Sequence, residues 1–167
     1  RVLFRSTECY DKGENLLENH RHVDLARGGK LEAWAQLFAV WMPDSLRGEA
    51  AFDRCCAVLD FAREQAGRYP GRLGIVEDAA GLRDTLDSGR CAGILTVEGA
   101  SALAGDLRHL EDLAARGVKL ITITWNGSNE LGHGCLSGCP DGLTPFGKRA
   151  VRRMEELSIL PHVSPLN

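Results

Sequence analysis

The sequence predicts an α/β fold with a mostly parallel sheet. Short apolar runs recur along the chain, and most are followed by a segment whose apolar residues are spaced three and four apart. Glycine or proline separates many of these segments. Strands that alternate with helices favour parallel pairing through right-handed crossovers. Because 167 residues suit one ordinary domain and no linker is visible, we expect residues 1–167 to form a single domain.

The first half of the chain contains one clear strand and one clear helix. Ala35–Trp41 is a nearly continuous apolar run, which suits a strand buried on both faces. Glu49–Ala66 places its apolar residues on one helix face. Leu73–Val76 is predicted to be a short extended segment, and Asp78 to cap a helix that runs to about Asp87.

The second half continues the alternation and contains one long loop. A strand of β-branched residues and a helix that opens with proline are its strongest local signals. The expected elements are a strand Ala92–Val97, a helix of about Ala104–Arg116, a strand Val118–Thr124, a loop Trp125–Leu143, a helix from Pro145 to about Leu157 and a strand from Ile159 onward.

Glu98 is the residue that points most directly to chemistry. It follows the apolar strand Ala92–Val97 and precedes Gly99. In parallel α/β sheets, side chains at the carboxyl ends of strands line the ligand crevice. A capping or surface glutamate is an equally good interpretation, since a strand end before glycine is also an ordinary turn. From the residues alone, both interpretations stay open.

Composition excludes several classes of protein. A net charge of -3 with mixed acidic and basic residues gives no basic stripe of the kind that nucleic acid requires. No apolar stretch is long enough to span a bilayer, and the first nine residues lack the zones of a signal peptide. We therefore expect a cytoplasmic protein with no membrane segment. Its six cysteines are expected to be reduced, because a chain with this much core needs no disulfide framework.

Three motifs, in this order, resemble the membrane dipeptidase family: Thr96–Gly99, Gly117–Asn126 and Gly142–Lys148. The similarity runs from about Thr7 to the end of the chain. It implies a metal-dependent hydrolase on a (β/α)8 TIM barrel, which cleaves dipeptides with two zinc ions and often forms homodimers. It also implies that this chain holds about half of the barrel, without the first and the C-terminal strands.

By motif match, the resemblance gives Glu98 the role of the carboxylate that bridges the two zinc ions. A shared anion lowers the repulsion between two nearby cations and helps position a water between them. Trp125 and Asn126 fall where the family contacts substrate. Trp125 cannot act as an acid or base, and a structural role at the rim is about as good an interpretation as substrate contact.

The chain departs from the family's ligand pattern at both ends. His22 and Asp24 have the spacing of the family's His-x-Asp pair, but their flanks match the approach to the second barrel strand, so we reject them. The pair should lie upstream of Cys9, where Arg1–Ser6 contains neither residue type. We interpret Arg1–Ser6 as a cloning or assembly artefact, because the end of a common sequencing adapter encodes it.

Near the other end, a zinc histidine of the family falls on Pro165, which cannot bind a metal. His162 would occupy a different strand position and point to the other face. A further histidine and a substrate-binding arginine would lie beyond Asn167. We expect the chain by itself to be inactive. The alternative is a non-catalytic, dipeptidase-like scaffold that binds small peptides or a partner.

A second metal site is not expected in the long loop. His133, Cys135 and Cys139 supply only three ligands, and the spacing of the two cysteines is looser than in common zinc sites.

Overall fold

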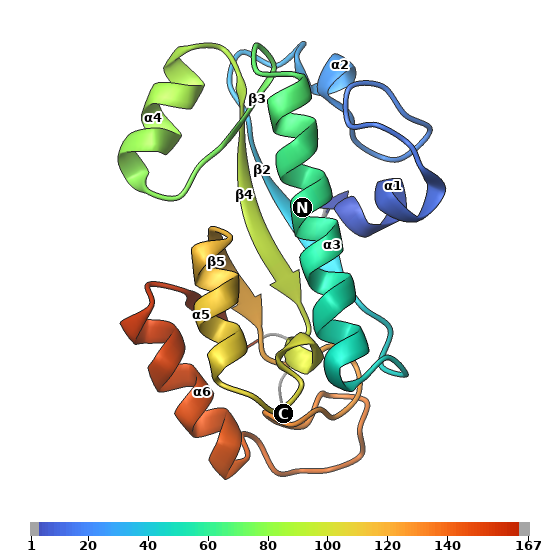
Figure 1. Cartoon of the computed structure of the whole chain (residues 1–167), viewed down its shortest axis with the longest axis vertical. Helices are drawn as coiled ribbons and strands as arrows, with labels where there is room; N and C mark the ends of the chain where they lie inside the picture. Colours follow the sequence, from blue (N-terminus) through green and yellow to red (C-terminus); the bar gives the residue numbers. More distant parts are fainter. Residues whose placement is uncertain (1–3, 164–167) are drawn as a thin grey trace. The chain divides into compact units, whose positions relative to one another are not determined.

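The structure, a computed structural model, describes residues 4–163 and alternates strands with helices (Figure 1). The chain forms two compact units. The first contains the residues up to Val40 together with Val58–Leu95, and the second contains Trp41–Ala57 together with the residues from Thr96 onward. The elements are β1 Phe4–Arg5, α1 Ser6–Lys12, α2 Leu25–Gly28, β2 Ala35–Trp41, α3 Gly48–Arg68, β3 Leu73–Ile75, α4 Ala79–Asp87, β4 Cys91–Glu98, the 3-10 helix η1 Ala100–Leu103, α5 Arg108–Ala115, β5 Val118–Thr122, α6 Pro145–Glu156 and β6 Leu160–His162.

The strand pairs whose register is known are parallel. Phe4 of β1 lies opposite Phe38 of β2, Leu73 of β3 opposite Cys91 of β4, and β5 pairs in the same sense with β6. The strand order is β1-β2-β4-β5-β6, with the short β3 also paired to β4. Apart from β3, each strand lies next to its predecessor in the chain. A barrel is built in that order, whereas a doubly wound sheet reverses direction partway.

The first unit packs large apolar side chains around a glycine of β4. A Cβ atom on Gly93 would lie 2.9 Å from Leu73 Cδ1 and 2.9 Å from Phe38 Cε2, so a larger residue here would have to displace these side chains. The α3 helix adds Phe61, whose ring meets Tyr10 edge-on at 5.8 Å. These contacts explain why β4 is buried here on both faces, as its continuous apolar run predicts.

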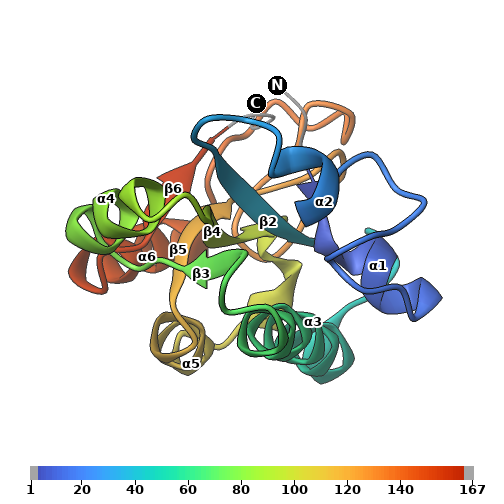
Figure 2. The same cartoon turned by 90° about the horizontal axis from the view of Figure 1, so that it is seen from above.

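In the second unit, α5 packs on β5, α6 packs on β6, and the two helices contact each other. Figure 1 shows α5 in front of β5. β6 lies beside β5 in the view from above (Figure 2), and Ile121 and Ile159 are fully buried. Residues alternate between the two faces of a strand. Leu160, the neighbour of Ile159, is accordingly 62% exposed. An ion pair of 2.7 Å between Arg153 and Glu111 joins α6 to α5.

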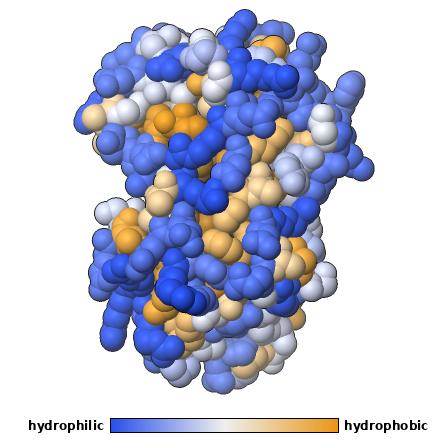
Figure 3. Space-filling model, viewed as in Figure 1, coloured by the Kyte–Doolittle hydropathy of each residue, from blue (hydrophilic) through white to orange (hydrophobic). Residues whose placement is uncertain are grey.

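Hydrophilic side chains dominate the outer surfaces of α5 and α6, with small hydrophobic areas between them (Figure 3). None of the helices within residues 4–163 has the length and apolar character that a membrane span requires.

Most expected elements are confirmed, and two expectations were wrong in detail. The helix expected from Ala104 begins only at Arg108, because Ala104 and Gly105 have φ angles of 52° and 75° that interrupt it. The strand expected to reach Thr124 ends at Thr122. Phe4–Arg5 forms strand β1, which pairs in parallel with β2. That Arg1–Ser6 is an artefact stays a prediction.

Candidate functional site

Glu98 is the last residue of β4, so the structure places its carboxylate where a buried strand ends. The preceding residues Leu95, Thr96 and Val97 are buried, whereas Glu98 is half-buried. Gly99 then turns the chain with a φ of 93°, which a residue with a side chain adopts only under strain. The chain thus holds a partly accessible carboxylate at a fixed strand end.

Two tryptophans accompany this strand end. Trp41 is the last residue of β2, and Trp125 follows β5. Their rings meet edge-on, with centroids 5.3 Å apart and planes at 75°. A Cβ atom on Gly99 would lie 3.5 Å from the Cβ of Trp125, so this tryptophan stands next to the residue that follows Glu98.

The loop after Trp125 is tied to the loop after Trp41. Gly127 N–H donates to Asp44 Oδ2 over 3.0 Å. Arg47 Nη2 donates to the carbonyl of Ser128 over 2.8 Å. We call these two hydrogen bonds the Asp44–Arg47 latch. The latch fixes the backbone two and three residues beyond Trp125.

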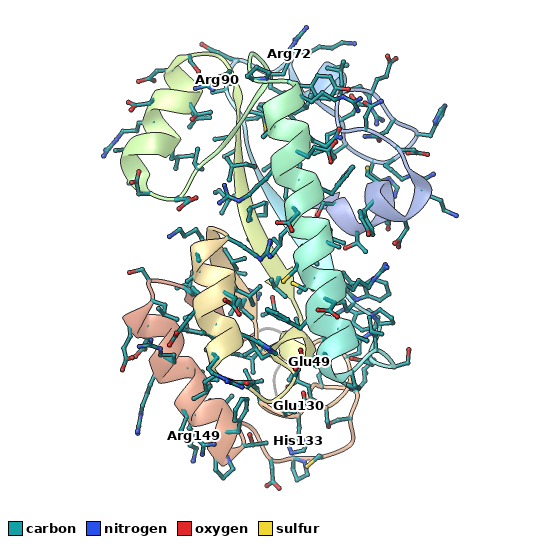
Figure 4. All side chains as sticks on the ribbon, viewed as in Figure 1. Glu49, Arg72, Arg90, Glu130, His133 and Arg149 are labelled. Atoms are coloured by element: carbon teal, nitrogen blue, oxygen red, sulfur yellow. The ribbon has the colours of Figure 1, made fainter. Side chains whose placement is uncertain are left out.

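Hydrogen bonds within the long loop hold its shape. Asn129 Nδ2 donates to the carbonyl of Ile123 over 2.7 Å, and Asn129 Oδ1 accepts from the backbone of Leu131. Ser128 Oγ lies 2.8 Å from His133 Nδ1, and Figure 4 shows His133 on this loop. Asn126, a predicted substrate residue, is half-buried, and its carbonyl accepts a hydrogen bond from the backbone N–H of Leu136.

Some buried polar atoms near this loop have no hydrogen-bond partner among the described residues: Arg47 Nη1, Thr124 Oγ1 and Glu130 Oε2. Such atoms are uncommon in proteins, because leaving them unsatisfied costs about 1–3 kcal/mol each. They lie on or beside the two loops that the latch joins.

His162 lies on β6 opposite Thr122 of β5, and its Nδ1 is 3.3 Å from the threonine hydroxyl. The contact places the two side chains on the same face of the sheet. Leu160, two residues earlier and therefore on that face, is 62% exposed. Pro165 lies outside the described residues.

The described residues do not assemble a metal site by themselves. No group of three or more His, Cys, Asp or Glu side chains lies together within residues 4–163. The other seven residues of the chain contain none of these four types. This donor set does not fit a two-metal centre, since each ion needs several ligands.

The other candidate metal ligands, Asp24, Cys135 and Cys139, do not belong to a group of three or more possible ligands among the described residues. Asp24 caps α2 and pairs with Arg27 over 2.7 Å. That His22 and Asp24 are not metal ligands stays a prediction. In the long loop, Cys135 is exposed and Cys139 Sγ lies 3.8 Å from a carboxylate oxygen of Asp141.

The prediction from sequence missed Trp41, Asp44 and Arg47. Trp41 ends a predicted strand, as Glu98 does, and the two polar residues follow directly in the next loop. The same strand-end argument that selected Glu98 would have selected them.

Comparisons with known proteins agree with this architecture. A sequence profile of the family described as membrane dipeptidase (peptidase family M19) matches residues 4–166. The crystal structure of dipeptidase AC, described as a metallopeptidase, is 28% identical with a TM-score of 0.80, covering 90% of this chain and 49% of that one. A metallopeptidase from Rhodobacter sphaeroides, crystallised with a phosphinate mimic of the dipeptide L-Ala-D-Ala, is 25% identical with a TM-score of 0.79, covering 90% of this chain and 51% of that one.

A protein of Acinetobacter calcoaceticus, described as uncharacterized, is 25% identical over an alignment of 170 positions that covers 87% of this chain and 54% of that protein. The chain thus spans about half the length of each of these three relatives. The structural likeness confirms the predicted fold class, an α/β fold whose parallel sheet corresponds to about half of a (β/α)8 barrel.

Proposed function

Because the chain belongs to the membrane dipeptidase family, we propose that the complete protein hydrolyses dipeptides with the help of two zinc ions. The similar structures support this proposal, since they include a dipeptidase and a metallopeptidase that binds a dipeptide mimic. The chain covers only about half of each of them. The activity is therefore proposed for the complete protein.

The placement of Glu98 at the carboxyl end of β4 carries the proposal. Active sites of barrel enzymes form at this end of the strands. A carboxylate shared by two zinc ions lowers their mutual repulsion, and Glu98 is the residue proposed to bridge them. Zinc ions held there would lower the pKa of a bound water and so supply a nucleophile near neutral pH.

Trp125 and Asn126 are proposed to border the substrate. They follow β5, the neighbour of β4 in the sheet, and both are half-buried. The remaining metal ligands are proposed to come from the rest of the complete protein, because no group of three donors lies together within residues 4–163. The chain by itself is therefore proposed to be inactive.

Metal analysis and kinetics of the complete protein test this proposal. The purified protein should contain about two zinc ions per chain and hydrolyse dipeptides. Glu98→Gln should lower both zinc content and kcat/KM, the latter by more than about a hundredfold, since even outer-shell partners of a metal contribute 10–100-fold. Glu155→Gln on the exposed side of α6 is the matched control and should change neither. Full activity and full zinc content in Glu98→Gln would refute the bridging role.

A second candidate is a non-catalytic scaffold that binds small peptides or a partner. The presence of His162 and Pro165 in place of the family's usual residues favours it. Under this proposal the complete protein would hold no zinc and hydrolyse no dipeptide, yet would still bind peptides in calorimetry.

We also propose a cytoplasmic homodimer. Light scattering of the purified protein tests whether it is a dimer. Fractionation of cells tests whether it is cytoplasmic.

A further inference from the structure

We propose that Trp41 and Trp125 form an aromatic wall beside Glu98 that selects dipeptides with a large apolar side chain. The inference rests on the proposed dipeptidase function and adds a substrate class and a new specificity residue, Trp41.

Strand spacing shows where the two rings lie. β2 and β5 are the neighbours of β4 on either side in the sheet order. Adjacent strands are about 4.8 Å apart, so the backbones of β2 and β5 are separated by roughly 10 Å. The ring centroids of Trp41 and Trp125 are only 5.3 Å apart. The two side chains therefore lean toward each other across the end of β4.

The residue after β4 is a glycine, which leaves room for the Trp125 side chain. Gly99 has no side chain, and a Cβ atom there would already be in contact with the Cβ of Trp125 at 3.5 Å. The pair thus stands next to Gly99, one residue beyond Glu98. Trp41 and Trp125 are each half-buried, so part of their surface is accessible.

The latch holds this arrangement in place. Asp44 and Arg47 follow Trp41 in the chain, and the atoms they bind, Gly127 N–H and the Ser128 carbonyl, follow Trp125. Each tryptophan is therefore fixed close to the point where the two loops are joined. A wall that is already ordered binds without the cost of ordering its side chains, about 0.5–1.5 kcal/mol for each.

An indole pair offers a broad apolar surface and no charge. Aromatic side chains gain about 0.5–1.5 kcal/mol from a suitably placed ring in addition to the burial of their area. Glycine would leave the wall uncovered, and a carboxylate side chain would lose water without gaining a partner. The preferred substrates are therefore dipeptides that carry leucine or phenylalanine.

Two substrate series measure this preference in the complete protein. The peptides are X-Gly and Gly-X, with X as Gly, Leu, Phe or Asp. In one of the series, kcat/KM for Phe should exceed that for Gly by roughly tenfold or more, the discrimination expected for a few apolar groups in a pocket. Trp41→Ala and Trp125→Ala should bring this ratio close to one. Trp41→Phe should keep most of it, because a ring remains.

The control is Leu136→Ala, which removes an apolar side chain that is 73% exposed on the same loop. It should leave the ratio unchanged. Circular dichroism of each variant shows whether it is folded, and the Phe variant keeps the test decisive if an Ala variant does not fold. A wild-type protein without the preference, or active tryptophan variants that retain it fully, would overturn the inference.

If the complete protein hydrolyses no dipeptide, the proposed function is refuted. The aromatic wall is then tested separately, by measuring peptide binding through tryptophan fluorescence. The part of the tryptophan emission that is lost in the Trp41→Phe, Trp125→Phe double variant comes from these two rings. Phe-Gly or Gly-Phe should change this emission and Gly-Gly should not. Identical titrations with the three peptides would overturn the wall itself.

Discussion

His109 stacks on Phe52, with ring centroids 3.7 Å apart and planes only 7° from parallel. The Nδ1 atom of His109 lies 2.9 Å from the carbonyl of Leu103, and since a carbonyl only accepts, Nδ1 carries the proton. Nε2 lies 3.7 Å from a carboxylate oxygen of Glu49, which Figure 4 shows near the start of α3. One imidazole thereby ties the turn after Glu98 to the first half of α3.

We expect His109→Ala to destabilise the protein by about 2 kcal/mol, from the lost ring stacking and the lost hydrogen bond to Leu103. His109→Phe keeps the stacking and should cost about 1 kcal/mol. Urea denaturation of the three proteins measures both values. His20→Ala, whose side chain is 95% exposed, is the control and should have almost no effect. If His109→Phe is as unstable as His109→Ala, stacking on Phe52 contributes little.

Glycine-to-alanine changes in two helices should have opposite effects. Gly147, in the first turn of α6, packs so closely on the backbone of Leu131 that a Cβ atom would overlap its carbonyl. Gly67, near the end of α3, has nothing within 4 Å of such an atom. Alanine normally stabilises a helix by about 0.5–1 kcal/mol relative to glycine.

Gly67→Ala should therefore raise the melting temperature, whereas Gly147→Ala should lower it, because overpacking typically costs about 1–3 kcal/mol. Differential scanning calorimetry of the two variants gives the signs directly. A higher melting temperature for Gly147→Ala would show that the long loop moves aside easily.

The spacing of apolar residues predicted helices and strands well where a long apolar run or a clear helical period was present. Ala35–Trp41 was predicted to be a strand with the bounds that β2 has, because a continuous apolar run is bounded on both sides. The short α1 and α2 were missed, since they have no long apolar period. The start of α5 was wrong because two residues, Ala104 and Gly105, adopt left-handed angles that the apolar spacing does not reveal.

The sequence predicted the site residues that one strand positions, but not the contacts between residues of different strands. The position of Glu98 at a strand end follows from its own neighbours in the chain. The contact of Trp41 with Trp125 and that of Thr122 with His162 depend on the order and register of strands. Pairing between distant segments leaves no periodic signal in one sequence, so these contacts required the structure.

The cysteines should differ sharply in reactivity. Burial raises the pKa of Cys9 to about 11 and of Cys91 to about 12, and it raises the pKa of the fully buried Cys55 as well. Cys135 is exposed. Because the thiolate is the reactive form, iodoacetamide at pH 8 should label Cys135 first and the three buried thiols only after unfolding.

Peptide mapping by mass spectrometry after short and long exposure reports the order of labelling. All six cysteines should react in guanidinium chloride, which serves as the control. Labelling of Cys91 at the rate of Cys135 in the native protein would contradict its burial.

Asp24 should make stability depend on pH in the acid range. Its Oδ1 accepts from Arg27 N–H at the start of α2, and its Oδ2 pairs with Arg27 Nε, each over 2.7 Å. Burial acts to raise the pKa of this carboxyl, but the hydrogen bonds from Arg27 and Asn19 outweigh burial and hold the pKa below its usual value of 3.8. A lowered pKa means that the folded protein favours the ionised form.

The contribution of this carboxylate is therefore present above pH 3.8 and is lost as the pH falls through the lower pKa of the folded state. Asp24→Ala removes the helix cap as well and should cost about 1–2 kcal/mol at pH 7. Asp24→Asn keeps an oxygen that accepts from Arg27 N–H and loses only the charge, so it should cost less. Urea denaturation at pH 7 and near pH 3 compares these variants with Asp87→Asn, a change at an exposed position. The difference between wild type and Asp24→Asn should shrink on acidification, and a difference that grows would mean that the protonated carboxyl is the better partner for Arg27.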